Sequence, residues 1–433
     1  MKKFKNNILF KNILILLTAG ALSKIIGMFG KILYTRMAGI NVVSLYTLIT
    51  PTLMLIIAIT QFSFPISISK LSAEGKYKNS DLLKSSYILN IFINIILIII
   101  VLVFSSTTAK MLNNNSLKLP IRLITLIIPF VSISSIQRGF LHGKEDMFAP
   151  SFTNIIEEIL KILLIIILLP LAISKNDITA VNFIILFNII TEISSIFIMN
   201  KVINKKYISN KGKMNFRITK DILSISLPTT SVRLISQIGF FIEPIILTNT
   251  LVNAGLSSKY ITVQYAIINS YIVPILSIPT FFSISIAAAL LPNITKLFYN
   301  KKYDAFKNKL SKLMFLSIII GIICLIIILL FPSTILKLVY NVKFGINYLY
   351  IIAPFFIILY MQPTLSVAIQ AMNKTNKLFF ISIISIGIKY TLLYILCNNG
   401  FGIASFLYAI ITGIIITTLL MIITVIKELK RLI

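Results

Sequence analysis

The sequence reads ILNIFINIILIIIVLVF from Ile88 to Phe104, seventeen residues without a charged side chain. A hydrocarbon core about 30 Å thick needs roughly 20 predominantly apolar residues in a helix, and this stretch approaches that length. Comparable stretches with few or no charges are Ile159–Ile173, Phe315–Phe331 and Phe401–Ile426. Hydrophobic residues make up 57% of the chain and charged residues 12%, with a mean hydropathy of +0.97. These values predict a polytopic membrane protein, for which transport is the default function.

The basic residues are distributed unevenly between the two sides of the predicted membrane. The chain carries 41 Lys and Arg against 12 Asp and Glu, a formal net charge of +29. Both termini and alternate loops hold 28 of the basic residues, whereas the intervening loops hold 8. Cytoplasmic loops are enriched in Lys and Arg, so we predict a cytoplasmic (inner) membrane protein with both termini in the cytoplasm. The asymmetry accounts for the positive charge, and no nucleic acid partner is predicted.

The apolar pattern predicts twelve membrane spans. We place them at 12–35, 44–69, 86–106, 120–141, 152–172, 180–200, 222–248, 260–292, 313–331, 345–371, 378–397 and 401–426. Every predicted outer loop is short, whereas a membrane polymerase or glycosyltransferase needs a loop or domain large enough to hold its catalytic groups. The chain has two cysteines, both within spans, and one histidine. We therefore predict no enzyme, no metal site and no cofactor.

Two short sequence matches indicate an internal repeat with a shift near 226 residues. Ser69-Lys70-Leu71 returns as Thr295-Lys296-Leu297, and Ile128-Pro129-Phe130 returns as Ala353-Pro354-Phe355. Six spans in each half give both halves the same orientation, and such parallel repeats are related by an axis along the membrane normal. We predict an all-α fold of two six-helix lobes with a substrate site between them. The predicted division is a lobe at 1–200, a basic cytoplasmic linker at 201–221 and a lobe at 222–433.

The first predicted span carries cations within the membrane, where an ionised side chain is energetically unfavourable. An ionised side chain at the bilayer centre costs about 3 kcal/mol on insertion scales, so Lys24 and Lys31 are candidate functional residues. They are seven residues apart and lie on the same face of a helix. Arg36 follows near the outer end, where it and Lys31 could also snorkel to the interface. Small residues, which permit close approach of a helix or ligand, form a nearby stripe of Ala19, Ser23, Gly27 and Gly30.

The seventh predicted span combines polar residues with prolines. Arg233 and Gln237 are one turn apart and can serve one ligand. Glu243 is the only acid in this span, and Pro228 and Pro244 flank the group. Because proline removes a backbone hydrogen bond and permits bending, the span suits a gate, although prolines also serve packing in membrane helices.

The remaining charges within spans are interpreted as mainly structural. Glu157, Glu158 and Lys161 lie in the first turns of the fifth span, where Lys161 can pair with Glu157 at i,i+4. Glu192 and Lys389 lie in spans at the outside of their lobes. Pairing within each lobe is therefore expected for these two residues.

The motifs on these spans resemble a known family. Ser23-Lys24-x-x-Gly27 followed by Arg36-x-x-Gly39 resembles the first helix of lipid II flippases of the MurJ kind. Pro228–Leu247 and Leu290–Lys296 are similar to the stage V sporulation protein B family, as is Arg138–Lys144. The resemblance covers essentially the whole chain. The families that these motifs resemble belong to the MATE-like superfamily of polysaccharide and multidrug exporters.

This resemblance implies two six-helix lobes around a cavity that carries a polyprenyl-pyrophosphate-linked sugar from the inner to the outer leaflet. It places Lys24 at the family's cationic site, with Arg36 nearer the outer part of the cavity. The chain departs from the cell-division flippases in having Gly30 at the second cationic position and no cations at the matching places of the second and eighth spans. It also has twelve predicted spans, where relatives often have fourteen. These departures favour a sporulation-type or general polysaccharide-precursor branch.

The sequence thus predicts a flippase for a lipid-linked oligosaccharide or peptidoglycan precursor, working by alternating access within membrane lipid. The predicted substrate-binding residues are Lys24, Lys31, Arg36, Arg233, Gln237 and Asn269. The predicted ion-coupling or gating residues are Glu243, Pro228 and Pro244. The coupling ion, Na⁺ or H⁺, and the oligomeric state stay open, and a monomer is compatible with the sequence. The alternatives are a MATE-type Na⁺- or H⁺-coupled multidrug antiporter, a membrane enzyme acting on lipid-linked sugars, and a non-transporting scaffold.

Overall fold

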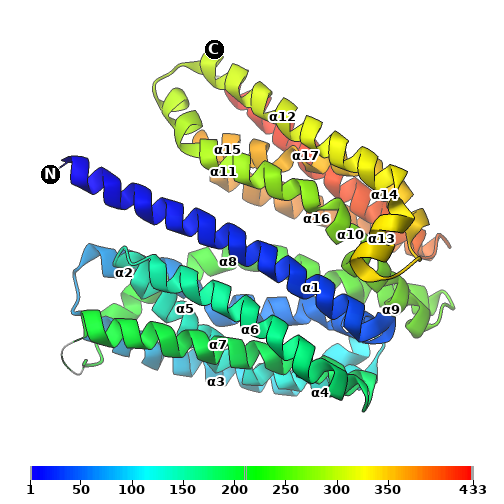
Figure 1. Ribbon diagram of the computed structural model, residues 1–433, viewed down its shortest axis with the longest axis horizontal. Coiled ribbons are helices and arrows are strands. Elements are labelled where there is room, and N and C mark those ends of the chain that lie inside the picture. Colours follow the sequence, from blue (N-terminus) through cyan, green and yellow to red (C-terminus); the bar gives the residue numbers. More distant parts are fainter. Residues whose placement is uncertain (1, 209, 211, 431–433) are drawn as a thin grey trace. The chain divides into compact units, whose positions relative to one another are not determined.

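The computed structural model describes residues 2–208, 210 and 212–430, with side chains from Thr18 onward except those of 232, 288–290 and 292. Over these residues the chain is helical and contains no strand (Figure 1). Helices form because the bilayer core offers no water to an unpaired backbone group, and a helix pairs its N–H and C=O groups within one segment. The predicted all-α fold is confirmed.

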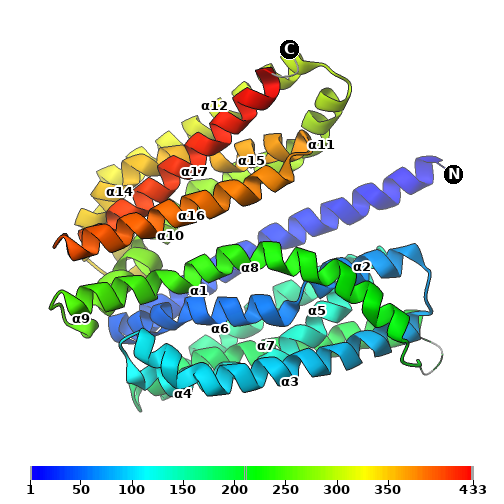
Figure 2. The same ribbon diagram turned by 180° about the vertical axis from the view of Figure 1, so that it is seen from behind.

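The chain divides into two compact units, Met1–Phe241 and Ile242–Ile433. The helices that begin in the first unit are α1 (Lys2–Gln61), α2 (Phe64–Glu74), α3 (Asn79–Met111), α4 (Lys118–Leu123), α5 (Ile128–Gly143), α6 (Phe148–Ile173), α7 (Asp177–Tyr207) and α8 (Phe216–Asn253). Short 3₁₀ turns lie at Asn115–Leu117 (η1) and Ile124–Leu126 (η2). Helix α6 packs beside both α1 and α7, and α5 packs beside α2 and α7 (Figure 2).

The second unit repeats this helical architecture. Its helices are α9 (Ser258–Ala266), α10 (Val273–Leu276), α11 (Ile278–Tyr299), α12 (Tyr303–Leu330), α13 (Pro332–Tyr340), α14 (Ile346–Leu359), α15 (Gln362–Ala371), α16 (Thr375–Asn398) and α17 (Ala404–Lys430). A π-helical turn, η3 (Ile267–Ile272), joins α9 to α10. Helix α11 lies beside α12 and α15, and α16 lies beside α17.

Several predicted spans are broken helices. The second span breaks at Phe62 and Ser63, which both have positive φ. The eighth span bends by 49° between Ser258–Leu276 and Ile278–Ala287. A proline lies in the first turn of the helix after each break. The N–H groups of a first turn have no partner within the helix, so proline, which lacks this group, is tolerated there. The kinks therefore divide single apolar segments without adding spans.

The described residues contain nine helical segments long and apolar enough to cross a membrane, and a tenth if the bent pair is one span. Helix α6 coincides with the fifth predicted span, but its three charged residues, Glu157, Glu158 and Lys161, keep it outside this set. The segment Thr18–Glu74 contains two of the predicted spans in one helical stretch. With these two corrections the segments correspond to the twelve predicted spans.

The two units meet within a helix. The division falls between Phe241 and Ile242 in α8, some twenty residues after the predicted linker at 201–221. The start of α8 belongs to the first unit because Ile218 and Ile222 are fully buried in its core with Phe64 and Phe140. The predicted lobe boundaries stay a prediction.

Gly39 separates the two spans contained in α1. Its backbone has φ 71° and ψ 167°, a region that is essentially restricted to glycine. A side chain there would meet no atom within 4 Å, so the constraint at this position comes from the backbone alone.

We expect Gly39→Ala to destabilise the protein by about 1–3 kcal/mol, the usual cost of a strained backbone conformation. Thermal unfolding of the detergent-purified protein measures the effect. The matched control is Gly20→Ala, which also meets no atom within 4 Å but lies in regular helix. Equal melting temperatures for the two variants would contradict the conclusion that the backbone conformation of Gly39 requires glycine.

Candidate functional site

The three predicted cations of the first span have exposed side chains on α1. Lys24, Lys31 and Arg36 are all exposed. Among the described residues, none of the ion pairs includes any of these three. Within the described part of the chain, three positive charges of a membrane-spanning helix are therefore left without a protein counter-charge, which is what a binding site for an anion requires.

The small-residue stripe of α1 contacts a neighbouring helix. A side-chain carbon built on Gly27 would lie 3.0 Å from Glu158 Oε2, and one built on Gly30 would lie 3.2 Å from Ile162. The Ser23 hydroxyl donates a hydrogen bond to the main-chain oxygen of Asn154 at 3.4 Å. The stripe thus packs on α6, which leaves the lysines on a different part of the α1 surface.

Arg233 lies on α8 with an exposed side chain, and its Nη2 donates to Gln61 Oε1 at 2.7 Å. Gln61 is the last residue of α1, so this contact links the end of α1 to α8. Gln237, one turn later, is half-buried. The described hydrogen bonds include none from the side chains of Lys24, Lys31 or Arg36, so no shared acceptor links these three cations to Arg233.

Glu243 is buried in the second unit with a cation of its own. Its side chain is 4% exposed and pairs with Lys389 on α16. The hydroxyl groups of Tyr265 and Tyr390 donate to the same carboxylate at 3.4 and 3.5 Å. The stem of Lys389 passes Gly413, where a side-chain carbon would lie 3.3 Å from its Cδ. The expected pairing of Lys389 within its lobe is confirmed.

We expect Lys389→Met to destabilise the protein by about 3–5 kcal/mol, because it leaves Glu243 as an uncompensated buried charge. Adding Glu243→Gln removes that charge, so the double variant should recover most of the loss. A double-mutant cycle on thermal unfolding tests this. Additive effects of the two substitutions would contradict a direct ion pair.

Asn269 lies in η3, the π-helical turn that joins α9 to α10. Its Nδ2 is buried without a hydrogen-bond partner in the described part of the chain. π-helical turns occur often at functional sites, and a buried unpaired amide is costly. The position therefore remains a candidate for binding a polar group.

A half-buried polar network in the first unit was not recognised as a functional candidate from the sequence. Arg138 on α5 donates to the side chains of Asn154 and Glu157 on α6, and Ser195 on α7 also donates to Glu157. Lys161 donates to Asn188 Oδ1 at 3.2 Å. The expected i,i+4 pair of Lys161 with Glu157 is therefore replaced, because Arg138 and Ser195 reach Glu157 from other helices. The available signal was an acid in the middle of an apolar segment.

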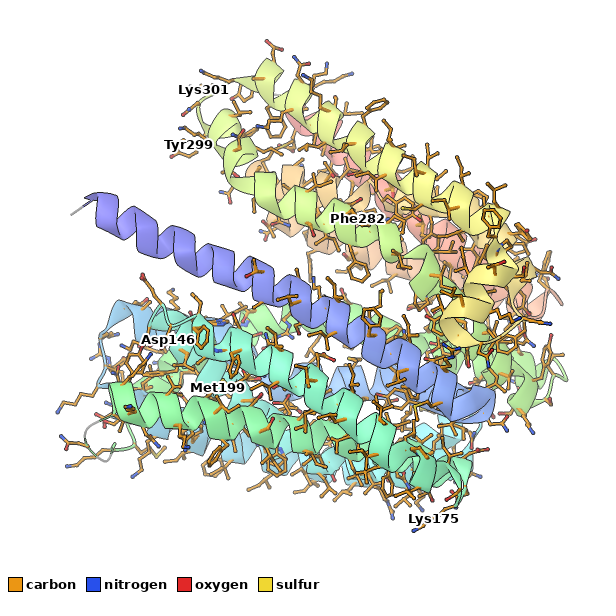
Figure 3. All side chains as sticks on the ribbon, in the orientation of Figure 1. Asp146, Lys175, Met199, Phe282, Tyr299 and Lys301 are labelled. Carbon is orange, nitrogen blue, oxygen red and sulfur yellow. The ribbon has the colours of Figure 1, made fainter. Side chains whose placement is uncertain are left out.

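The residues that precede and follow α6 lie at opposite ends of the first unit. Figure 3 shows Asp146, just before α6, and Lys175, just after it, at opposite ends of this unit. At the first end Lys206 pairs with Asp146 at 2.8 Å. Asp221, the last residue of the predicted cytoplasmic linker, accepts hydrogen bonds from Tyr77 at 2.7 Å and from Lys76 at 3.2 Å.

The hydrogen bonds of Lys76 with Tyr77 and with Asp221 raise the pKa of Lys76. Its contribution to stability is therefore present below the unfolded-state pKa, about 10.4, and is lost as the pH rises through the higher folded-state pKa. We expect Lys76→Met to lower the melting temperature slightly at pH 7 and to match the wild type at higher pH. Lys78→Met is the control, because Lys78 is exposed and in none of the described ion pairs. A loss that persists above pH 11 or so would contradict this assignment.

Comparison with known proteins places the chain in a superfamily of membrane transporters. A family model described as polysaccharide biosynthesis protein matches residues 9–298, and a MatE model matches residues 268–395. Because the first match spans more than half of the sequence, the chain belongs to the polysaccharide biosynthesis protein family.

Individual relatives agree with this assignment. Stage V sporulation protein B of Bacillus subtilis (strain 168) is 28% identical over 436 residues, which cover 97% of this chain and 84% of that protein. The structure of an inward-facing multidrug resistance MATE family transporter gives a TM-score of 0.77 at 15% identity, covering 95% of each chain. The inward closed lipid II flippase MurJ gives 0.71 at 17% identity, covering 97% of this chain and 90% of MurJ. The predicted membership of the MATE-like superfamily of polysaccharide and multidrug exporters is confirmed, and the similarity to stage V sporulation protein B agrees with the resemblance of the sequence motifs.

Proposed function

We propose that this protein is a flippase that moves a polyprenyl-pyrophosphate-linked oligosaccharide or peptidoglycan precursor across the cytoplasmic membrane by alternating access. The observation that carries the proposal is the set of exposed cations on α1, Lys24, Lys31 and Arg36, which form no ion pair among the described residues. Family membership and the likeness to stage V sporulation protein B support it.

The charge of the substrate explains why these cations belong in the membrane. A pyrophosphate has to leave water to cross the bilayer, and paired charges offset part of that cost. Charge-assisted hydrogen bonds contribute about 1.5–3 kcal/mol each. Lys24 and Lys31 bind the pyrophosphate together with Arg233, and Arg36 receives it as the cavity opens outward. Gln237 and Asn269 meet sugar hydroxyl groups.

The membrane potential acts in the direction of export. Moving one charge through 100 mV is worth about 2.3 kcal/mol, and a cytoplasm-negative potential favours outward movement of an anion. Glu243, Pro228 and Pro244 take part in gating or in coupling to Na⁺ or H⁺. Each proline removes one main-chain donor from α8 and allows it to bend. Both chain termini lie in the cytoplasm in this proposal.

We expect Lys24→Ala to lower the affinity for the pyrophosphate head group at least tenfold, because about 1.5–3 kcal/mol of binding is lost. The measurement is leaflet accessibility of lipid-linked cell-wall precursor in depleted cells complemented by each variant. Precursor should accumulate in the inner leaflet with Lys24→Ala and reach the outer leaflet with the wild type or Lys24→Arg. Lys175→Ala, an exposed lysine beyond α6, is the matched control.

An unchanged precursor distribution on depletion would overturn the flippase proposal. The alternative is then a MATE-type Na⁺- or H⁺-coupled multidrug antiporter, which the MatE match at residues 268–395 favours. An antiporter for organic cations needs an accessible acid, whereas Glu243 is enclosed and paired with Lys389. Efflux of ethidium that depends on Glu243 would support this alternative.

A further inference from the structure

Glu243 of the second unit is buried and Glu192 of the first unit is half-buried, and the surroundings of these two acids differ. Glu243 is surrounded by donors from Lys389, Tyr265 and Tyr390, so both of its carboxylate oxygens have partners. Glu192 on α7 has a buried Oε2 without any hydrogen-bond partner among the described residues. An ionised carboxylate with an oxygen left unpaired in an apolar interior is costly, and a proton removes that cost.

The charged groups around Glu192 strengthen this contrast. Glu157 from α6 and Arg138 and Ser134 from α5 lie close enough to Glu192 to act on it electrostatically. Arg138 is engaged by Glu157 and Asn154, and Lys161 of α6 donates to Asn188, one turn before Glu192. Glu192 therefore has no cation of its own among the described ion pairs. Two carboxylates close together with one cation share a proton.

We infer that Glu192 is a proton-binding site in the first unit and that its proton is the coupling ion of transport, which leaves Glu243 the gating role. Proton uptake converts the Glu192 carboxylate to a carboxylic acid, and release returns the proton to the aqueous phase. Release leaves two carboxylates around Arg138, so the guanidinium is drawn away from its bonds to Glu157 and Asn154. This inference rests on the proposed function for its transport role, whereas the proton site itself does not.

A continuous set of contacts connects this site to α1. Arg138 donates to the side chain of Asn154, and the main-chain oxygen of Asn154 accepts from Ser23, which directly precedes Lys24. One turn along, Glu158 lies against Gly27 of α1. Movement of Arg138 therefore alters the contacts that hold α1 beside α6, where the proposed pyrophosphate-binding lysine is located. This gives proton binding a physical route to the substrate site.

Infrared spectroscopy tests the proton site directly. At neutral pH the purified full-length protein should show the C=O stretch of a buried protonated carboxyl group, and Glu192→Gln should abolish it. Glu243→Gln is the matched control, a buried glutamate with the same substitution, and should leave the band unchanged. A band of equal intensity in Glu192→Gln would overturn the proton site.

A second variant keeps the test independent of how well Glu192→Gln folds. Glu157→Gln removes the neighbouring negative charge and releases Arg138 to pair with Glu192. Glu192 should then ionise, so the same band should be lost at neutral pH. Persistence of the band in Glu157→Gln, with no change in its pH dependence, would contradict the arrangement proposed for Glu157, Arg138 and Glu192.

The coupling role is tested in proteoliposomes with a fluorescent geranylgeranyl-pyrophosphate-linked N-acetylglucosamine as the probe. One coupled proton shifts the transport equilibrium about tenfold per pH unit of gradient. The wild type should show this dependence, and Glu192→Gln should flip the probe at a rate insensitive to the gradient. Gradient-dependent flipping by Glu192→Gln would overturn the coupling role. Failure of the wild type to flip the probe would count against the proposed function, while the infrared result would still decide the proton site.

Discussion

Every charged side chain within the membrane-spanning helices of this protein has to be stabilised without bulk water. A buried charge needs a partner or an aqueous cavity, and this protein meets the constraint in two ways. Within each unit, an acid is paired with a cation from another helix of the same unit, Glu157 with Arg138 and Glu243 with Lys389. On α1 the lysines remain exposed and outside the described ion pairs. The internal charges thus hold helices together, and the exposed ones are available to a ligand.

Length, apolar composition and loop charge were sufficient to predict the all-α membrane fold, because the thickness of the bilayer fixes the length of a span. The breaks within spans were less predictable. Phe62 and Ser63 adopt positive φ without a glycine to signal it. The division of the chain within α8 was also not evident, because the side chains that bury its first turns in the first unit are ordinary isoleucines.

The candidate site was predictable where a residue was unusual for its surroundings. Lys24 and Arg233 were recognised because cations are rare in apolar segments, and the expectation that Lys389 pairs within its lobe is confirmed. The partners themselves could not be predicted, since they come from distant helices. Lys161 was expected beside Glu157 from helical spacing, yet Arg138 occupies that carboxylate from α5. A local spacing rule describes one isolated helix and does not include competition from its neighbours.

Helix α8 carries one contact of each unit within a few turns. Arg233 bonds to Gln61 in the first unit, and Glu243 pairs with Lys389 in the second. Each residue added to an α-helix turns everything beyond it by about 100°. A single insertion or deletion between Arg233 and Glu243 would therefore rotate one anchor away from its partner while the other stayed in place. The segment between them is accordingly constrained in length more strictly than in the identity of its side chains.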